Sequence, residues 1–114
     1  MITVQTLIDA LPLSVFHLDD PDRPVEGGYC GDLLSWVMGR APAGGAWLTI
    51  MSNVNVAAVA ALTDVSCVIL AEDVVPDPPL LDRARTQGIT LLGTGLSVYD
   101  CACRLGGLLG ETGL

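Results

Sequence analysis

Apolar residues recur along this chain with helical spacing in some stretches and as short unbroken runs in others. The first stretch has helical spacing, with apolar side chains at Val4, Leu7, Ile8 and Leu11. Thr3 stands where an N-cap is expected, and Pro12 ends the pattern. The spacing therefore predicts a helix over residues 4–11.

Short apolar runs later in the chain predict strands. They cover Ser14–Leu18, Pro24–Tyr29, Ala46–Ile50, Cys67–Leu70 and Thr90–Leu92. Proline cannot donate to a ladder of backbone hydrogen bonds, so Pro24 indicates an edge strand or the beginning of one.

Helix signals follow most of these strands. The residues expected to open a helix are polar and sit just before an apolar segment: Asp32, Asn53, Asp77 and Ser97. Pro78 suits a first helical position and Gly88 a C-terminal cap, which predicts a helix ending at Gln87. Ser97 with Asp100 three residues later resembles a capping box.

Apolar strands that alternate with helices indicate a parallel sheet covered on both faces. The predicted fold class is α/β, with a small open, mainly parallel sheet and helices on both faces. A chain of 114 residues has the usual size of one domain. We expect that domain over residues 1–105, followed by a Gly-rich C-terminal tail over residues 106–114.

Charge and hydropathy narrow the possible partners. The net charge is −8, and the five basic side chains are all Arg, which leaves no basic face for nucleic acid or for anionic lipid. No apolar run reaches the roughly 18 residues of a membrane span, and residue 1 begins no pattern typical of a signal peptide. We therefore expect a cytoplasmic protein with reduced thiols and no nucleic-acid or membrane partner.

The hydrophobic content predicts a homodimer. Hydrophobic residues make up 51% of the chain, which is high for a domain of this size. In the helix expected over Val54–Leu62 only Asn55 is polar, so that helix must be buried on more than one side. Closed two-fold association is the commonest way to bury such a surface.

Three turns rich in Gly, Ser, Thr or Asn precede helices and form the candidate ligand cleft. Loops at the carboxyl ends of parallel strands are where ligands usually bind. The candidate residues are Gly27, Gly28, Tyr29, Asp32, Ser52, Asn53, Asn55, Thr94, Gly95 and Ser97. None of the turns is a phosphate loop or a dinucleotide fingerprint, so the other interpretation is tight turns with helix caps.

Titratable residues form no readable catalytic or metal set. The pair Cys101 and Cys103 would not face each other on a helix, and a metal site needs about four ligands. Glu72 and Asp73 follow a strand and would bind a metal ion or a ribose hydroxyl, or else form a solvated loop. We expect no metal, no cofactor and no catalytic residues.

The combined motifs resemble the DRTGG domain family. The resemblance rests first on the stretch from Asp22 to Met38, which contains Asp22-Arg23, Gly27-Gly28-Tyr29 and Asp32-Leu33-Leu34-Ser35. The stretches at 47–50, 55–60 and 95–97 are also similar to that family, so it covers roughly residues 1–105. The chain departs from the pattern in having no Thr between Arg23 and the glycines, so no hydroxyl role is carried over.

The resemblance implies a small α/β domain, similar to the amino-terminal domain of HPr kinase/phosphorylase, with a regulatory or dimer-forming role and no activity of its own. If 24–29 is extended, Arg23 and Gly28 lie about 16 Å apart and cannot share one site. We therefore expect Asp22 and Arg23 to be structural.

The predicted function is a non-enzymatic regulatory or dimerisation module. It would bind a small anionic ligand such as a nucleotide, or a partner protein such as a regulated enzyme. The alternative is a small enzyme that uses Cys30 or His17 in the glycine-loop cleft.

Overall fold

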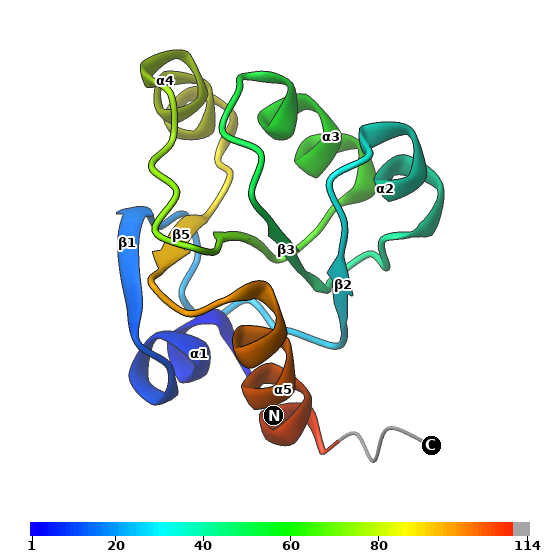
Figure 1. Ribbon diagram of the computed structural model, residues 1–114, viewed down its shortest axis with the longest axis vertical. Coiled ribbons are helices and arrows are strands. Elements are labelled where there is room, and N and C mark those ends of the chain that lie inside the picture. Colours follow the sequence, from blue (N-terminus) through cyan, green and yellow to red (C-terminus); the bar gives the residue numbers. More distant parts are fainter. Residues whose placement is uncertain (111–114) are drawn as a thin grey trace.

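The computed structural model describes residues 1–110, and within them helices and strands alternate along most of the chain (Figure 1). The strands are β1 (Leu13–His17), β2 (Gly28–Cys30), β3 (Ala46–Thr49), β4 (Cys67–Leu70) and β5 (Leu91–Thr94). The helices are α1 (Val4–Ala10), α2 (Leu34–Arg40), α3 (Asn55–Thr63), α4 (Pro78–Gln87) and α5 (Val98–Leu109).

The strands form one mixed sheet in the order β1-β5-β4-β3-β2. Strands β2 to β5 are parallel to one another, and β1 joins β5 antiparallel. This arrangement confirms the predicted α/β class with a mainly parallel sheet. It also places β2 at one edge of the sheet, as Pro24 had indicated.

The direction of the strand order decides which helices cover which face. From β2 to β5 each strand lies beside the one before it, and right-handed crossovers then put every connecting helix on the same face. Helices α2, α3 and α4 accordingly lie together on one side, and α1 and α5 lie on the other (Figure 1). The second face is thus covered by the first and last helices of the described chain.

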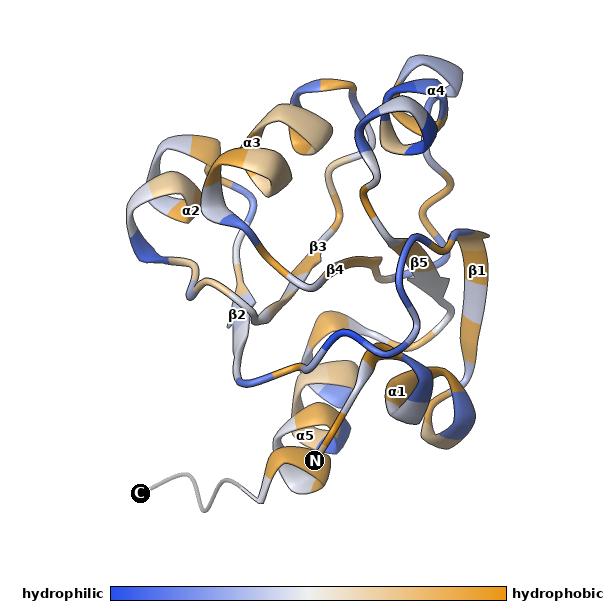
Figure 2. Ribbon diagram, turned by 180° about the vertical axis from the view of Figure 1, so that it is seen from behind, coloured by the Kyte–Doolittle hydropathy of each residue, from blue (hydrophilic) through white to orange (hydrophobic). Residues whose placement is uncertain are grey.

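Side chains alternate between two cores because successive strand residues point to opposite faces. Trp47, Val68 and Leu91 pack under α2, α3 and α4. Leu48, Ile69 and Leu92 face α1 and α5. Figure 2 shows the apolar strands between the two helical layers. Burying one such side chain stabilises the fold by about 1.5–3 kcal/mol, so both layers are held mainly by apolar contact.

Several predicted caps are confirmed. The Thr3 hydroxyl accepts a hydrogen bond from the Thr6 amide, and the Thr6 hydroxyl accepts one from the Thr3 amide. Gly88 ends α4 in the left-handed region at φ 67°. The Ser97 hydroxyl accepts a hydrogen bond from the Asp100 amide at the start of α5.

Two predicted boundaries differ from the observed ones. The run 24–29 is not one strand, since Pro24 makes a single bridge to Thr3 and β2 begins only at Gly28. Residues 106–109 are the last turn of α5 rather than a tail, because Leu108 and Leu109 pack on the same core as Leu105. The remaining tail residues 111–114 lie outside the described residues.

Arg23 fixes the segment before β2 to the end of α3. Asp64 caps α3 in the left-handed region at φ 57°, where a residue other than Gly is strained. The Arg23 guanidinium donates to the Asp64 carbonyl at 2.7 Å and lies 3.0 Å from its carboxylate. Asp22 takes part in the preceding turn, where its amide donates to the Asp20 carboxylate at 2.9 Å.

We predict that Arg23→Ala lowers the free energy of unfolding by about 1–2 kcal/mol, because a charge-assisted bond to a strained cap is lost. Arg83→Ala, which removes an exposed Arg from α4, should change it by less than about 0.5 kcal/mol. Urea unfolding of both variants measures the difference. Equal effects of the two substitutions would show that the Arg23 contact does not stabilise the fold.

Candidate functional site

The carboxyl ends of β2, β3, β4 and β5 meet at one edge of the sheet, because these strands are parallel. Four loops leave this edge and lead into α2, α3, α4 and α5. Of the predicted site residues, they carry Asp32, Ser52, Asn53, Gly95 and Ser97. These loops therefore leave the sheet at the same edge, and what they can bind depends on what their polar groups contact.

The adjacent strands β4 and β5 send their following helices to opposite faces of the sheet (Figure 1). Such a divergence opens a crevice at the carboxyl ends of the two strands, where open α/β sheets usually bind ligands. The crevice lies between the loop after β4, which carries Glu72 and Asp73, and the loop after β5, which carries Gly95 and Ser97.

Backbone hydrogen bonds close this crevice. The Glu72 amide donates to the Leu96 carbonyl at 2.9 Å, and the Asp73 amide donates to the Thr94 carbonyl at 3.0 Å. Glu72 and Asp73 each have φ 61°, a left-handed conformation that side chains other than Gly adopt at a cost. A Cβ added at Gly95 would lie 3.0 Å from the Asp73 carboxylate, so Gly95 leaves the space that Asp73 needs.

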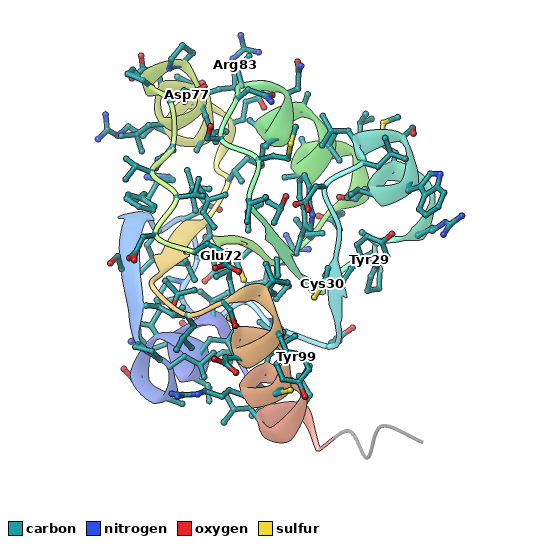
Figure 3. The ribbon with its side chains drawn as sticks, viewed as in Figure 1. Tyr29, Cys30, Glu72, Asp77, Arg83 and Tyr99 are labelled. Carbon is teal, nitrogen blue, oxygen red and sulfur yellow. The ribbon has the colours of Figure 1, made fainter. Side chains whose placement is uncertain are left out.

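The first turn of α5 is occupied by the chain's own carboxylate. Figure 3 places Glu72 beside the start of α5. Its carboxylate accepts a hydrogen bond from the Val98 amide at 3.1 Å, while Ser97 serves the Asp100 amide. A carboxylate at this position is favoured because unpaired amides and the helix dipole both attract negative charge. The Val98 and Asp100 amides, which an anionic ligand would otherwise contact here, are therefore already in use.

Asp32 has a similar role after β2. Its carboxylate accepts hydrogen bonds from the Thr49 hydroxyl at 2.7 Å and from the Ile50 amide at 3.0 Å. The sequence had suggested that Asp32 caps α2, but the N-cap of that helix is Leu33. Asp32 instead ties β2 to the end of β3, where the partly buried donors attract its carboxylate.

The polar residues before α3 form a tight turn. The Asn53 side chain accepts a hydrogen bond from the Asn55 amide at 2.9 Å. Asn53 stands one residue before Val54, the N-cap of α3. The Ser52 carbonyl accepts one from the Asp77 amide at 2.9 Å, which joins this loop to the start of α4. These contacts make the loop a tight turn, and the prediction of Asn53 as the N-cap was wrong, because the N-cap is Val54 and it makes no side-chain cap hydrogen bond.

The glycine pair does not join the other candidate residues. Gly28 is paired with Ala46, the first residue of β3, whereas Asp32 contacts the last, Thr49. Gly27 and Gly28 therefore lie at the amino end of β2, away from the loops. Neither has a positive φ, so a left-handed backbone is not the reason for glycine at these two positions. The space is instead limited by Leu105, whose side chain would lie 3.0 Å from a Cβ at Gly28.

Gly28 and Tyr29 instead line a groove between β2 and α5. Its volume is about 210 Å³, and no charged side chain lines it. The lining residues are Gly28, Tyr29, Cys30, Ala102, Leu105, Gly106 and Leu109. No local pattern in the sequence marks this groove, because it brings together segments some 70 residues apart.

A second pocket lies at the opposite, amino edge of the sheet. It has a volume of about 200 Å³ and is lined in part by Asp19, Asp20, Arg23, Asp64 and Thr90. The Asp19 amide donates to the Thr90 hydroxyl at 3.0 Å, and Arg23 is held by Asp64. Its polar groups serve the fold, and no sequence motif pointed to it.

The thiols of Cys30, Cys67 and Cys101 are not activated. Burial, and then the nearby Asp32, raises the pKa of Cys30 above its usual value. Burial raises the pKa of Cys67 to about 12 and that of Cys101 to about 11. A thiol with a raised pKa is a poor nucleophile at neutral pH. His17 lies on β1, at the opposite edge of the sheet from Cys30, so the two do not form one site.

Within residues 1–110, no group of three or more His, Cys, Asp or Glu side chains is arranged to hold a metal ion. None of the helices there has both the length and the apolar content that crossing a membrane requires.

The chain is similar in structure to part of a known regulatory protein. No protein-family model and no curated protein sequence matches the chain. Among solved structures, it is similar to the CBS and DRTGG domains of the regulatory region of Clostridium perfringens pyrophosphatase, complexed with the activator diadenosine tetraphosphate. The TM-score is 0.70 at 12% identity, and the match covers 90% of this chain and 45% of that chain. This likeness concerns the fold, and it supports the DRTGG-like fold that the sequence resemblance implied.

We predict that Glu72→Ala lowers the free energy of unfolding by about 1–2 kcal/mol, because α5 loses both an acceptor and a charge at its first turn. Glu72→Gln keeps an oxygen acceptor and should lose about half as much. Thermal or urea unfolding measures both. As a control, Asp82→Asn neutralises an exposed carboxylate in α4 and should have an effect below about 0.5 kcal/mol. If all three substitutions cost the same, Glu72 is not a cap.

Proposed function

We propose that this chain is a non-catalytic regulatory module that acts by self-association as a homodimer and by contact with a partner protein such as a regulated enzyme. The closed crevice between β4 and β5 carries the proposal. At the place where this fold would expose a catalytic or anion-binding site, the amides of Glu72 and Asp73 and the Glu72 carboxylate are bonded to the loop before α5 and its first turn. A pocket of about 220 Å³ beside β1 is lined in part by Asp73, Thr94 and Gly95 of the same segments. Because the Glu72, Asp73 and Val98 amides are in use, we assign the action of the module to its surface rather than to this crevice.

The structural likeness supports a regulatory role. The similar solved structure is a regulatory region, and it was determined with a nucleotide activator. We infer that a nucleotide or other small anion is not held by the loop edge of this chain. The Ile50 and Val98 amides already serve carboxylates, and a net charge of −8 repels phosphates. Any nucleotide response would come from another part of the surface.

The apolar surface left exposed supports self-association. Helix α3, which the sequence suggested as the dimer contact, buries Val56, Ala57, Val59 and Ala60 within the chain. It leaves Leu62 exposed at 74%. Leu33 and Trp36, at the start of α2, are also about half exposed, at 55% and 52%. Apart from Leu62, these exposed apolar residues lie outside α3, and a partner copy would cover Leu33 and Trp36.

Light scattering at micromolar concentration tests the proposed homodimer. We expect about twice the chain mass of 11.9 kDa. At 0.15 M salt, repulsion between the two negative copies is screened beyond about 8 Å, so apolar contact should prevail. A mass equal to one chain at all concentrations would contradict self-association.

A thermal-shift screen with diadenosine tetraphosphate, ATP and AMP tests the inference on nucleotides. We expect no nucleotide to raise the Tm through the loop edge, so any shift should persist in Glu72→Gln and Asp32→Asn. A Tm rise in the native chain that either substitution abolishes or strongly changes would place the nucleotide at that edge and contradict the inference.

A further inference from the structure

We propose that the second copy docks on the open edge of β2, so that β2 of each chain pairs antiparallel with its counterpart and the two sheets become one. This inference rests on the proposed homodimer and assigns its interface. It identifies the partner as a second copy of this chain and the contact as backbone pairing flanked by uncharged side chains.

The backbone of β2 exposes unpaired groups at this edge. β2 is the last strand in the sheet order of residues 1–110. The Gly27 carbonyl accepts a bond from Ala46, and the Gly31 amide donates to Leu48, at 2.9 and 3.2 Å. Alternate residues of an edge strand turn their backbone groups in opposite directions. Gly28 and Cys30 therefore turn their N–H and C=O groups away from β3, toward the outside of the sheet.

β2 has little besides its short length to guard its edge against pairing. Natural edge strands are usually protected by short length, charge, proline, a bulge or a covering segment. The three residues of β2 include no charge and no proline, and Gly28 and Cys30 are exposed. The other edge strand differs: β1 has a register irregularity between Val15 and His17, and Asp19 and Asp20 follow it. Of the two edges, β2 is the one suited to pairing.

Charge also selects this surface. Two copies that each carry −8 repel one another wherever their acidic groups meet. The groove between β2 and α5 is lined only by uncharged residues, whereas the pockets at the amino edge and beside β1 contain Asp19, Asp64 or Asp73. The groove itself therefore presents no acidic group to a second copy, and the nearest carboxylates in sequence are Glu26 and Asp32, which flank β2.

The pairing has one register that uses all outward groups of β2. Tyr29 then lies opposite Tyr29 of the second copy, and each Gly28 forms a hydrogen-bonded pair with the opposing Cys30. The two α5 helices lie on the same face of the joined sheet, where Ala102 and Gly106 beside the groove let them approach closely. The two Cys30 residues come within about 9 Å of each other, on the α5 face.

Cross-linking of the full chain with a short bismaleimide tests this register. Cys30 and Cys103 are exposed, whereas Cys67 and Cys101 are buried. The reaction is run at pH 8.5, because the pKa of Cys30 is raised. We expect a covalent dimer from the native chain and from Cys103→Ser, and at least a tenfold lower yield from Cys30→Ser. A cross-link that depends on Cys103 instead, or none from a chain that light scattering shows to be dimeric, would overturn the assigned interface and leave the homodimer standing.

A matched pair of charge substitutions tests the same surface without cross-linking. Cys30→Lys places a charge in the β2 edge, and Leu62→Lys places the same charge on the exposed end of α3. Both substitutions make the net charge of the chain less negative, so only a local effect of the new charge can weaken association. We expect Cys30→Lys to raise the dimer Kd at least tenfold and Leu62→Lys to leave it within twofold, at unchanged Tm. The reverse order would overturn the interface, and a native chain that is monomeric throughout would overturn the homodimer as well.

Discussion

The contact between the loop after β4 and the first turn of α5 is the constraint on which the rest of this molecule depends. Helix α5 must cross from the carboxyl end of β5 to the face that α1 alone cannot cover. Glu72 holds its first turn through the Val98 amide, and Glu72 and Asp73 accept a strained backbone to reach the loop. The same contact that completes the second core removes the crevice where a ligand would bind.

Closing that crevice moves the available chemistry from the loops to the edges of the sheet. The carboxyl edge is acidic, and its best donors are bonded to Asp32 and Glu72. The amino edge is tied by Arg23 and Asp64. Within residues 1–110, the edge of β2 beside α5 combines outward backbone groups with a groove that no charged side chain lines. Figure 3 labels Tyr29 and Cys30 on this edge. A chain built in this way is suited to recognising another chain by its backbone and its apolar side chains.

The sequence predicted the strands other than β2, and several helix caps, well, because apolar runs and residues such as Thr3, Gly88 and Ser97 act locally. It did not predict the left-handed turn at Glu72, since no Gly marks it and the bond to Val98 that compensates the strain is formed 26 residues away. The strand predicted over residues 24–29 ended just after Gly28, which placed Gly28 beside the loops. The observed strand β2 instead begins at Gly28. The groove between β2 and α5 could not be predicted from the sequence, because it forms only when α5 packs beside β2.

A phosphate titration followed by 1H–15N correlation spectra tests most directly whether the chain closes its own loop edge. We expect the amide signals of Ile50 and Val98 not to move as inorganic phosphate is raised to tens of millimolar, since these two amides donate to the Asp32 and Glu72 carboxylates. Saturable shifts of these two signals, with the rest of the spectrum unchanged, would show an open anion site at the loop edge and contradict its closure by the chain's own carboxylates.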